Sequence, residues 1–338
     1  MEQQIISRFN DAILQEAMRR YSIAPDHIQA LDAFESFIYA FRQGEGEFIL
    51  RIGHSLRKAE ALIWGEVDWI NHLARGGVSV ARAVLSVGGN LVEAMDDGLG
   101  GQFFATAFVK ARGQKPWEVG WSPEKFVGYG RLIGKMHALA VGYLPPVAAW
   151  KRPEWDDVEN QFVERYLPAS EVIAHEKYRE LYEYLVTLPK DDRSYGLIHQ
   201  DAHQNNFMMD TDGTLTLYDF DDCAYSWFVS DLAIVLFYIA FDAEELGFPT
   251  MEAFTADFMS HFLRGYREEY ALDPRWLREI PHFLKLRELE LYAVVFRDFD
   301  VENIDDWWIA NFMRGRKARI EAGLPFVEVD FEAFAVYL

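Results

Sequence analysis

The sequence has 338 residues, of which half are hydrophobic and 15% aromatic, so a peptide-sized scaffold and a disordered chain are excluded. The 33 Lys and Arg residues against 54 Asp and Glu residues give a formal net charge of −21. This charge argues against nucleic acid or an anionic membrane as the partner.

Neither a disulfide nor a membrane segment is expected. The only cysteine is Cys223, so no intrachain disulfide can form. The N-terminus lacks the basic and apolar segments of a secretory signal. The longest apolar stretch, 232–241, is about half of the roughly 20 residues that cross a membrane. We therefore expect a cytoplasmic protein.

The first part of the chain is expected to form a small sheet with helices. Apolar residues at helical spacing predict one amphipathic helix over about the first 20 residues and another over 62–73. A hairpin with its turn at 43–46 is expected between them. The expected strands are 33–41, 47–52, 78–85, 90–95 and 102–109.

The pattern changes at the polar segment 110–116, after which long helical periods predominate. We therefore expect a domain boundary there, between an N-terminal lobe of residues 1–109 and a C-terminal lobe of residues 110–338. Ser122, followed by Pro123, is expected to cap the first long helix of the second lobe.

One short β-like segment, 195–220, lies among these helices and carries most of the informative polar residues. A turn at 210–213 joins two short strands, and such a hairpin brings the residues before its first strand close to those after its second. Asp201 and Asn206 are therefore expected to face Asp219. Carboxylate and amide oxygens that converge in this way suit a hard cation such as Mg²⁺.

The spacing His199-x-Asp201-x-x-x-x-Asn206, followed by a hairpin and Asp219-Phe220, resembles the catalytic and metal-binding loops of kinase-like phosphotransferases. The residue pattern is most similar to that of the group of aminoglycoside phosphotransferases, choline kinases and homoserine kinases. The resemblance implies an α+β, two-lobe protein-kinase-like fold. A small antiparallel sheet and a helix would form the N-terminal lobe, and the larger C-terminal lobe would be mostly helical.

The same resemblance implies an enzyme that uses ATP and Mg²⁺. It would transfer the γ-phosphoryl group to the alcohol hydroxyl of a small molecule, such as an aminoglycoside or an amino alcohol, and this acceptor can be a cation. Two alternatives stay open: a bacterial Ser/Thr protein kinase of the same fold, and a nucleotide-binding pseudokinase without turnover.

In the second lobe the resemblance assigns a role to each polar residue of the motif. Asp201 would orient the acceptor hydroxyl and take its proton, and Asn206 and Asp219 would hold Mg²⁺. His199 would be structural, close to the metal loop. Asp221 would add a water-mediated metal contact or a substrate contact.

In the first lobe the resemblance requires a cation on a strand, paired with a helix glutamate, to hold the α- and β-phosphates. Arg51 stands where protein kinases have lysine, and Glu66 in the following helix is the natural partner. Arginine is a larger, forked donor and is not interchangeable with lysine. The alternative for these two residues is an ordinary surface ion pair.

The remaining nucleotide contacts are also expected in the first lobe. The segment 31–41 has no glycine, so Ser36 and its two neighbours would cover the phosphates in place of a glycine-rich loop. The backbone around Thr106, Phe108 and Val109 would hydrogen-bond adenine.

A different chemistry is possible for part of the motif. His199, Asp201 and His203 would lie on one face of an extended segment and could bind a transition metal, as in a hydrolase. This interpretation leaves the spacing of Asn206 and Asp219 unexplained, so we favour the phosphotransferase.

The sequence also leads to expectations about three further residues. Gln200 stands where the small-molecule members usually have glycine. Asp231 is expected to be the N-cap of the apolar helix over 232–241, from which its family counterpart steadies the catalytic loop. His137 lies at helical spacing with apolar residues and is expected in the core.

Overall fold

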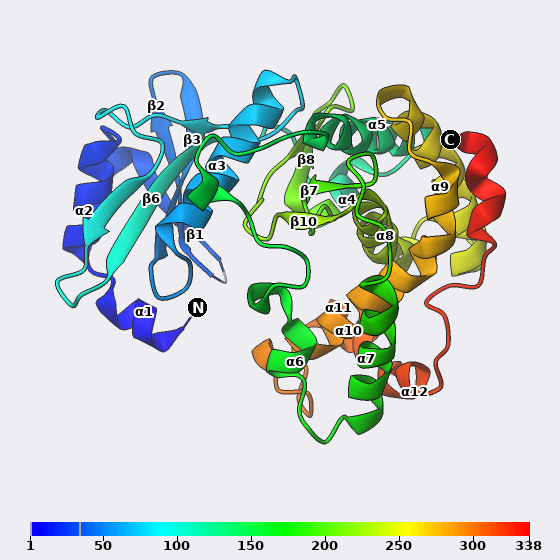
Figure 1. The fold of residues 1–338 in the computed structure, drawn as a ribbon. Coiled ribbons are helices and arrows are strands. Elements are labelled where there is room, and N and C mark those ends of the chain that lie inside the picture. Colours follow the sequence, from blue (N-terminus) through cyan, green and yellow to red (C-terminus); the bar gives the residue numbers. More distant parts are fainter. Residues whose placement is uncertain (1, 34) are drawn as a thin grey trace. The chain divides into compact units, whose positions relative to one another are not determined.

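The computed structural model describes residues 2–33 and 35–338, so Phe34, expected in the first strand of the hairpin, lies outside the described residues. The chain forms two compact units, each of which is described by itself (Figure 1). The first unit consists of Met1–Lys115, Leu144–Arg152 and Phe207–Asp221. The second consists of Pro116–Tyr143, Pro153–Asn206 and Asp222–Leu338.

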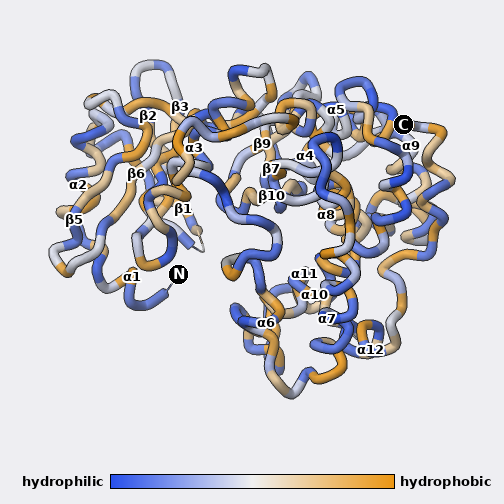
Figure 2. Tube along the Cα trace, viewed as in Figure 1, coloured by the Kyte–Doolittle hydropathy of each residue, from blue (hydrophilic) through white to orange (hydrophobic). Residues whose placement is uncertain are grey.

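The first unit is built on an antiparallel sheet with the strand order β1-β2-β3-β6-β4, in which β5 also pairs with β6. Its strands are β1 (Ile28–Leu31), β2 (Phe37–Gln43), β3 (Gly46–His54), β4 (Ala83–Val84), β5 (Glu93–Asp96) and β6 (Gln102–Val109). Its helices are α1 (Gln3–Arg8), α2 (Asp11–Arg20) and α3 (Glu60–Arg75). Figure 2 shows hydrophobic residues along the strands of this sheet.

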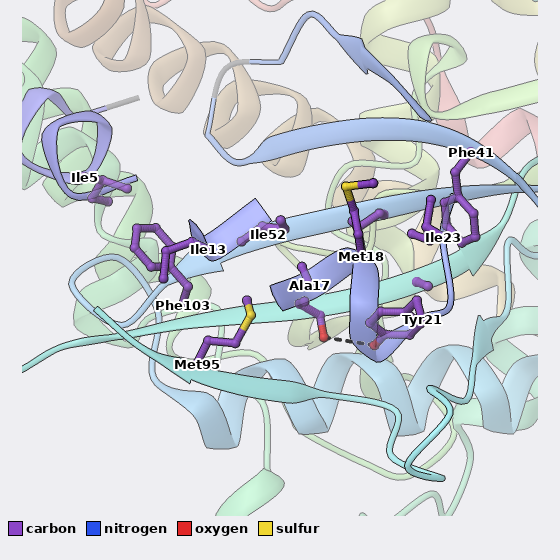
Figure 3. Packing of buried hydrophobic residues seen from close by; sticks show 13 residues of the cluster. Ile5, Ile13, Ala17, Met18, Tyr21, Ile23, Phe41, Ile52, Met95 and Phe103 are labelled. Carbon is purple, nitrogen blue, oxygen red and sulfur yellow. Dashed lines mark hydrogen bonds between the residues drawn. The ribbon is translucent and has the colours of Figure 1, made fainter. Parts of the chain in front are cut away.

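The hydrophobic core of this unit lies between α2 and the sheet. Ile13, Ala17 and Met18 of α2 belong to one buried cluster with Ile52 of β3 and Phe103 of β6 (Figure 3). These side chains recur on one face of the helix, and their burial keeps the central strands in place.

The prediction of a single N-terminal helix is wrong, because the structure has two helices there, α1 and α2. The backbone is extended at Phe9, and the Asn10 side chain then caps α2 by accepting hydrogen bonds from Ala12 N and Ile13 N at 3.0 and 3.2 Å. Phe9 is free to stack on Phe37 of β2, with 3.7 Å between ring centroids. Aromatic packing and a local N-cap thus interrupt the helical spacing.

The strand expected over 78–85 is reduced to the two residues of β4 because its first part pairs elsewhere. Ala81 N donates to Leu217 O at 2.9 Å, and Leu217 N donates to Ser79 O at 3.0 Å. Leu217 belongs to the hairpin of β8 (Phe207–Met209) and β9 (Leu215–Leu217), which the sequence predicts over nearly the same residues. This hairpin is therefore part of the first unit.

The second unit is mostly helical. Its helices are α4 (Pro116–Val119), α5 (Pro123–Ala140), α6 (Phe162–Tyr166), α7 (Val172–Leu185), α8 (Phe228–Ile239), α9 (Met251–Glu269), α10 (Ile280–Asp298), α11 (Trp307–Met313) and α12 (Arg316–Glu321). A two-stranded sheet pairs β7 (Tyr195–Ile198) with β10 (Ala224–Trp227). Ser122 caps α5 as expected, accepting a hydrogen bond from Lys125 N at 3.4 Å.

Helices α5 and α9 approach closely because glycines line their contact. A Cβ atom on Gly130 or Gly134 of α5 would overlap with the carbonyl oxygens of Phe262 and Tyr266 in α9. Among the described residues, no helix is long and apolar enough to span a membrane.

Candidate active site

The catalytic loop predicted at 199–206 follows β7 in the second unit and is held by Asp231. The buried Asp231 carboxylate accepts hydrogen bonds from His199 N at 3.0 Å and Gln200 N at 2.9 Å. His137, buried in the core as expected, lies 3.2 Å from the same carboxylate and 2.7 Å from Tyr266 Oη. One side chain thus fixes the backbone just before Asp201.

Asp231 does not occupy the position that its helix spacing predicts. Helix α8 begins at Phe228, and Trp227 is its N-cap residue, so Asp231 lies inside the first turn. The N-cap expectation is wrong, because the buried strand β10 runs directly into the helix and leaves the aspartate free to reach the loop. The contact with the loop is the one that the resemblance implies.

The backbone is strained at one residue in each of the two loops that carry the motif. Gln200 has φ of 69° and Asp219 has φ of 64°, both in the left-handed region that favours glycine. Such a conformation costs about 1–2 kcal/mol for a residue with a Cβ atom. The φ of Gln200 explains why glycine suits this position in the group that the sequence resembles. Strain of this kind clusters at functional loops.

Both carboxylate oxygens of Asp201 have partners in the second unit. Oδ2 accepts a hydrogen bond from Asn206 Nδ2 at 2.9 Å and lies 3.2 Å from His203 Nε2. Oδ1 accepts a hydrogen bond from Arg287 Nη2. Burial would raise the pKa of Asp201, but His203 and Arg287 hold it below its usual range. Asp201 is therefore ionised at neutral pH.

Arg287 comes from α10 and was not predicted from the sequence. Its guanidinium also donates to Tyr238 Oη at 2.7 Å and lies 3.7 Å from Glu290 Oε2. Burial raises the pKa of Glu290 to about 7, although Arg287 opposes this rise. No local motif could reveal Arg287, because it lies 86 residues after Asp201 in the chain.

The predicted pair of Arg51 and Glu66 is formed within the first unit. Nη1 and Nη2 of Arg51 donate to the two oxygens of Glu66 at 2.8 and 2.7 Å, and Glu66 is only 1% exposed. The pair is thus buried and bidentate rather than a surface pair. Burial would lower the pKa of Arg51, but Glu66 holds it above its usual range.

Asp221 lies among three cations of the first unit. Its Oδ1 is 2.7 Å from Lys58 Nζ and 3.6 Å from Arg51 Nη1, and its Oδ2 is 2.5 Å from Arg57 Nη2. Burial would raise the pKa of Asp221, but Lys58, Arg57 and Arg51 hold it well below its usual range. Arg57 and Lys58 were not predicted from the sequence. The only signal for them is two adjacent basic residues directly after a strand.

A small cavity of the first unit lies beside these cations. Its lining includes Ser36, Arg51, Arg57, Lys58, Thr106 and Asp221. Thr106 lies opposite Arg51 in the pairing of β6 with β3, and Phe108 lies under the Arg51 guanidinium at 5.1 Å. Cationic side chains around a hollow suit the phosphates of a nucleotide.

The expected metal ligands come from both units. Asn206 ends the catalytic loop in the second unit, whereas Asp219 follows β9 in the first. The expectation that Asp219 faces Asp201 and Asn206 stays a prediction. Within the described ranges, no group of three or more His, Cys, Asp or Glu side chains is placed to hold a metal ion. The hydrolase-type cluster of His199, Asp201 and His203 is therefore not formed, and His199 Nδ1 instead lies 3.3 Å from Asp201 N.

Comparisons with known proteins agree over most of the chain. The sequence pattern of the phosphotransferase enzyme family matches residues 27–280. The amicoumacin kinase of Bacillus subtilis (strain 168) is 37% identical over 323 residues, which cover 96% of this chain and 95% of that protein.

Solved structures resemble this one over nearly its whole length. An amicoumacin kinase in complex with AMP-PNP, Ca²⁺ and Ami has a TM-score of 0.92 at 33% identity, covering 98% of this chain and 99% of that chain. A spectinomycin phosphotransferase in complex with ADP and spectinomycin has a TM-score of 0.58 at 13% identity, covering 96% and 97%. The predicted α+β, protein-kinase-like fold is confirmed.

Proposed function

The chain belongs to the phosphotransferase enzyme family and is a kinase for a small-molecule hydroxyl, and we propose that it phosphorylates amicoumacin or a similar alcohol with ATP and Mg²⁺. The observation that carries the proposal is the setting of Asp201, an ionised carboxylate held by a strained, firmly anchored loop. The identity of 37% to an amicoumacin kinase over 96% of the chain supports this acceptor.

Asp201 would act on the acceptor hydroxyl. The proton of the hydroxyl passes to the carboxylate while the hydroxyl oxygen bonds to the γ-phosphorus. The bond from this phosphorus to the bridging oxygen breaks, and ADP leaves with its electron pair. Because phosphoryl transfer needs little covalent help, orientation of the hydroxyl and neutralisation of charge supply most of the rate.

Asn206 and Asp219 would hold the Mg²⁺. Asn206 fits this role because its Nδ2 donates to both Asp201 O and Asp201 Oδ2 at 2.9 Å, which turns the amide oxygen away from that carboxylate. Amide and carboxylate oxygens are the donor types that Mg²⁺ prefers. When bound, the metal neutralises charge on the phosphate oxygens.

Arg51, Arg57 and Lys58 would bind the phosphates from the cationic cavity of the first unit, which Ser36 also lines. Glu66 would keep the Arg51 guanidinium in place through its two hydrogen bonds. Asp221 has a structural explanation beside its expected metal or substrate contact, because its ion pairs fix Arg57 and Lys58.

Adenine would bind at the end of β6. Thr106 and Phe108 pair with Arg51 and Ile49 of β3, so their backbone groups already belong to the sheet. Val109 N donates to Arg82 O at 2.9 Å. Lys110 N donates to Glu47 O at 3.0 Å. The carbonyl of Val109 is therefore the better candidate for a hydrogen bond to the base, while the Thr106 side chain lines the cavity.

The test is phosphorylation of amicoumacin by the purified chain. We expect ATP consumption and a phosphate monoester in ³¹P NMR, which stop on addition of EDTA and return with excess Mg²⁺. The same assay with Ser- and Thr-containing peptides should give no phosphopeptide. Binding of AMP-PNP without turnover of any alcohol would contradict the proposal and favour a pseudokinase, and phosphopeptide formation would favour a protein kinase.

A further inference from the structure

Arg287 joins the Asp201 carboxylate to a rigid part of the second unit. Its Nη2 donates to Asp201 Oδ1 and, at 2.7 Å, to Tyr238 Oη. The guanidinium also lies 5.2 Å from the centre of the Tyr238 ring, and its Nη1 is 3.7 Å from Glu290. Tyr238 and Arg287 belong to α8 and α10, which pack against each other. The position of the guanidinium is therefore fixed by two long helices.

The partners of Asp201 leave one place for an acceptor hydroxyl. An ionised carboxylate offers about four lone-pair sites, two on each oxygen. Oδ2 already has two neighbours, Asn206 Nδ2 at 2.9 Å and His203 Nε2 at 3.2 Å. Among the described residues, Oδ1 has one hydrogen-bond donor, Arg287. The remaining site is on Oδ1, beside the guanidinium.

We propose that Arg287 is a positioning residue of the phosphoryl transfer: by holding Oδ1 of Asp201, it directs the second lone pair of this oxygen toward the acceptor hydroxyl. The inference rests on the proposed function. The proton of the hydroxyl passes to Oδ1 as the hydroxyl oxygen bonds to the γ-phosphorus, and ADP leaves with the electron pair of the broken bond. Arg287 forms no covalent bond and acts only through Asp201.

The shape of the guanidinium explains why an arginine stands here. Nη2 of the planar fork donates to both Asp201 and Tyr238 while Nη1 faces Glu290, whereas a lysine would offer a single nitrogen for all three. Arg287→Lys should therefore keep the charge beside Oδ1 and lose part of the orientation, and Arg287→Gln should lose both.

The experiment compares kcat and KM of Arg287→Lys and Arg287→Gln with amicoumacin as the acceptor. We expect Arg287→Gln to lower kcat about 10- to 100-fold, because a misplaced catalytic group costs up to roughly 10²-fold in rate. The KM for ATP and the KM for amicoumacin should each change less than about threefold. Arg287→Lys should keep a kcat between those of the wild type and Arg287→Gln. The matched control is Arg297→Gln on the same helix, whose guanidinium pairs with the adjacent Asp298 at 2.7 Å and lies 5.1 Å from the centre of the Tyr166 ring; it should behave as the wild type.

Chemical rescue separates positioning from a merely structural role. Guanidinium ion at non-denaturing concentration should raise the kcat of Arg287→Ala several-fold, as long as this variant still binds AMP-PNP. If Arg287→Ala does not fold, the ranking of Arg287→Lys above Arg287→Gln decides, with AMP-PNP affinity as the measure of folding.

Several results would overturn the inference. A positioning role through Asp201 predicts a loss of kcat near the 10- to 100-fold range. A kcat for Arg287→Gln within about twofold of the wild type, or an effect confined to KM, would therefore contradict it. Loss of AMP-PNP binding in both Arg287→Lys and Arg287→Gln would also contradict it, because it would show a structural role. These results leave the proposed function intact when the wild type phosphorylates amicoumacin. If the wild type phosphorylates no alcohol, the proposed function fails and this inference fails with it.

Discussion

Replacing Asp231 by alanine tests how the catalytic loop is held. The fully buried carboxylate accepts hydrogen bonds from His199 N at 3.0 Å and Gln200 N at 2.9 Å, and His137 Nε2 lies 3.2 Å away. Without it, two buried backbone N–H groups lose their acceptor, and each unsatisfied group costs about 1–3 kcal/mol. Asp231→Ala should therefore lower the free energy of unfolding of the second unit by about 2–5 kcal/mol.

This loss is measured by urea unfolding, followed through tryptophan fluorescence. With an m-value of roughly 2–3 kcal/mol/M, the midpoint should fall by about 1–2 M. Asp231→Asn keeps one acceptor oxygen and should lose about half as much. The control is Asp257→Ala on α9, whose carboxylate only approaches His261 at 3.7 Å on the surface and should contribute less than about 0.5 kcal/mol.

Activity should fall together with stability, because the same two hydrogen bonds orient the residue before Asp201. We expect kcat of Asp231→Ala to fall about 10- to 100-fold under conditions in which the variant is still folded. A midpoint for Asp231→Ala no lower than that of Asp257→Ala would refute the reasoning that this carboxylate anchors the loop.

Two further predictions concern stability. Gly130→Ala should lower the free energy of unfolding by about 1–3 kcal/mol, because the new Cβ overlaps with Phe262 O. The control, Gly128→Ala on the same helix, places its Cβ in open space and should raise the free energy of unfolding by about 0.5–1 kcal/mol. Equal melting temperatures for the two variants would contradict this prediction. Burial raises the pKa of Asp242 to about 6 despite a hydrogen bond from Gln204. The folded state therefore binds this proton more tightly than the unfolded state, and about 1–3 kcal/mol of stability present below pH 4 is lost as the pH rises through 6. Asp242→Asn should make the urea midpoint less dependent on pH between pH 4 and 7. If the midpoint of the variant changes with pH as that of the wild type does, the raised pKa of Asp242 is contradicted.

The sequence predicted well what local chemistry determines. The motif around Asp201 and Asn206 is recognisable because its residues are close in the chain, and the β8–β9 hairpin follows from its turn. The pair of Arg51 and Glu66, 15 residues apart, was implied by the family resemblance, which requires a cation on a strand and a glutamate on the following helix.

Long-range contacts could not be predicted in this way. Arg287 reaches Asp201 across 86 residues, and Arg57 reaches Asp221 across 164. The packing of whole helices and strands determines which carboxylate a distant cation contacts. The periodicity of the sequence does not predict this packing. The same cause shortened β4, because Leu217 of a distant hairpin took the backbone groups that a longer strand would have used.

The most direct test of the proposed mechanism is the turnover of Asp201→Asn, which keeps the size of the side chain and removes its ability to take a proton. With ATP, Mg²⁺ and amicoumacin, we predict a kcat about 10²- to 10⁴-fold below that of the wild type, the range expected for loss of a general base, with unchanged affinity for AMP-PNP. A kcat within about tenfold of the wild type would contradict the assignment of Asp201 as the residue that receives the proton.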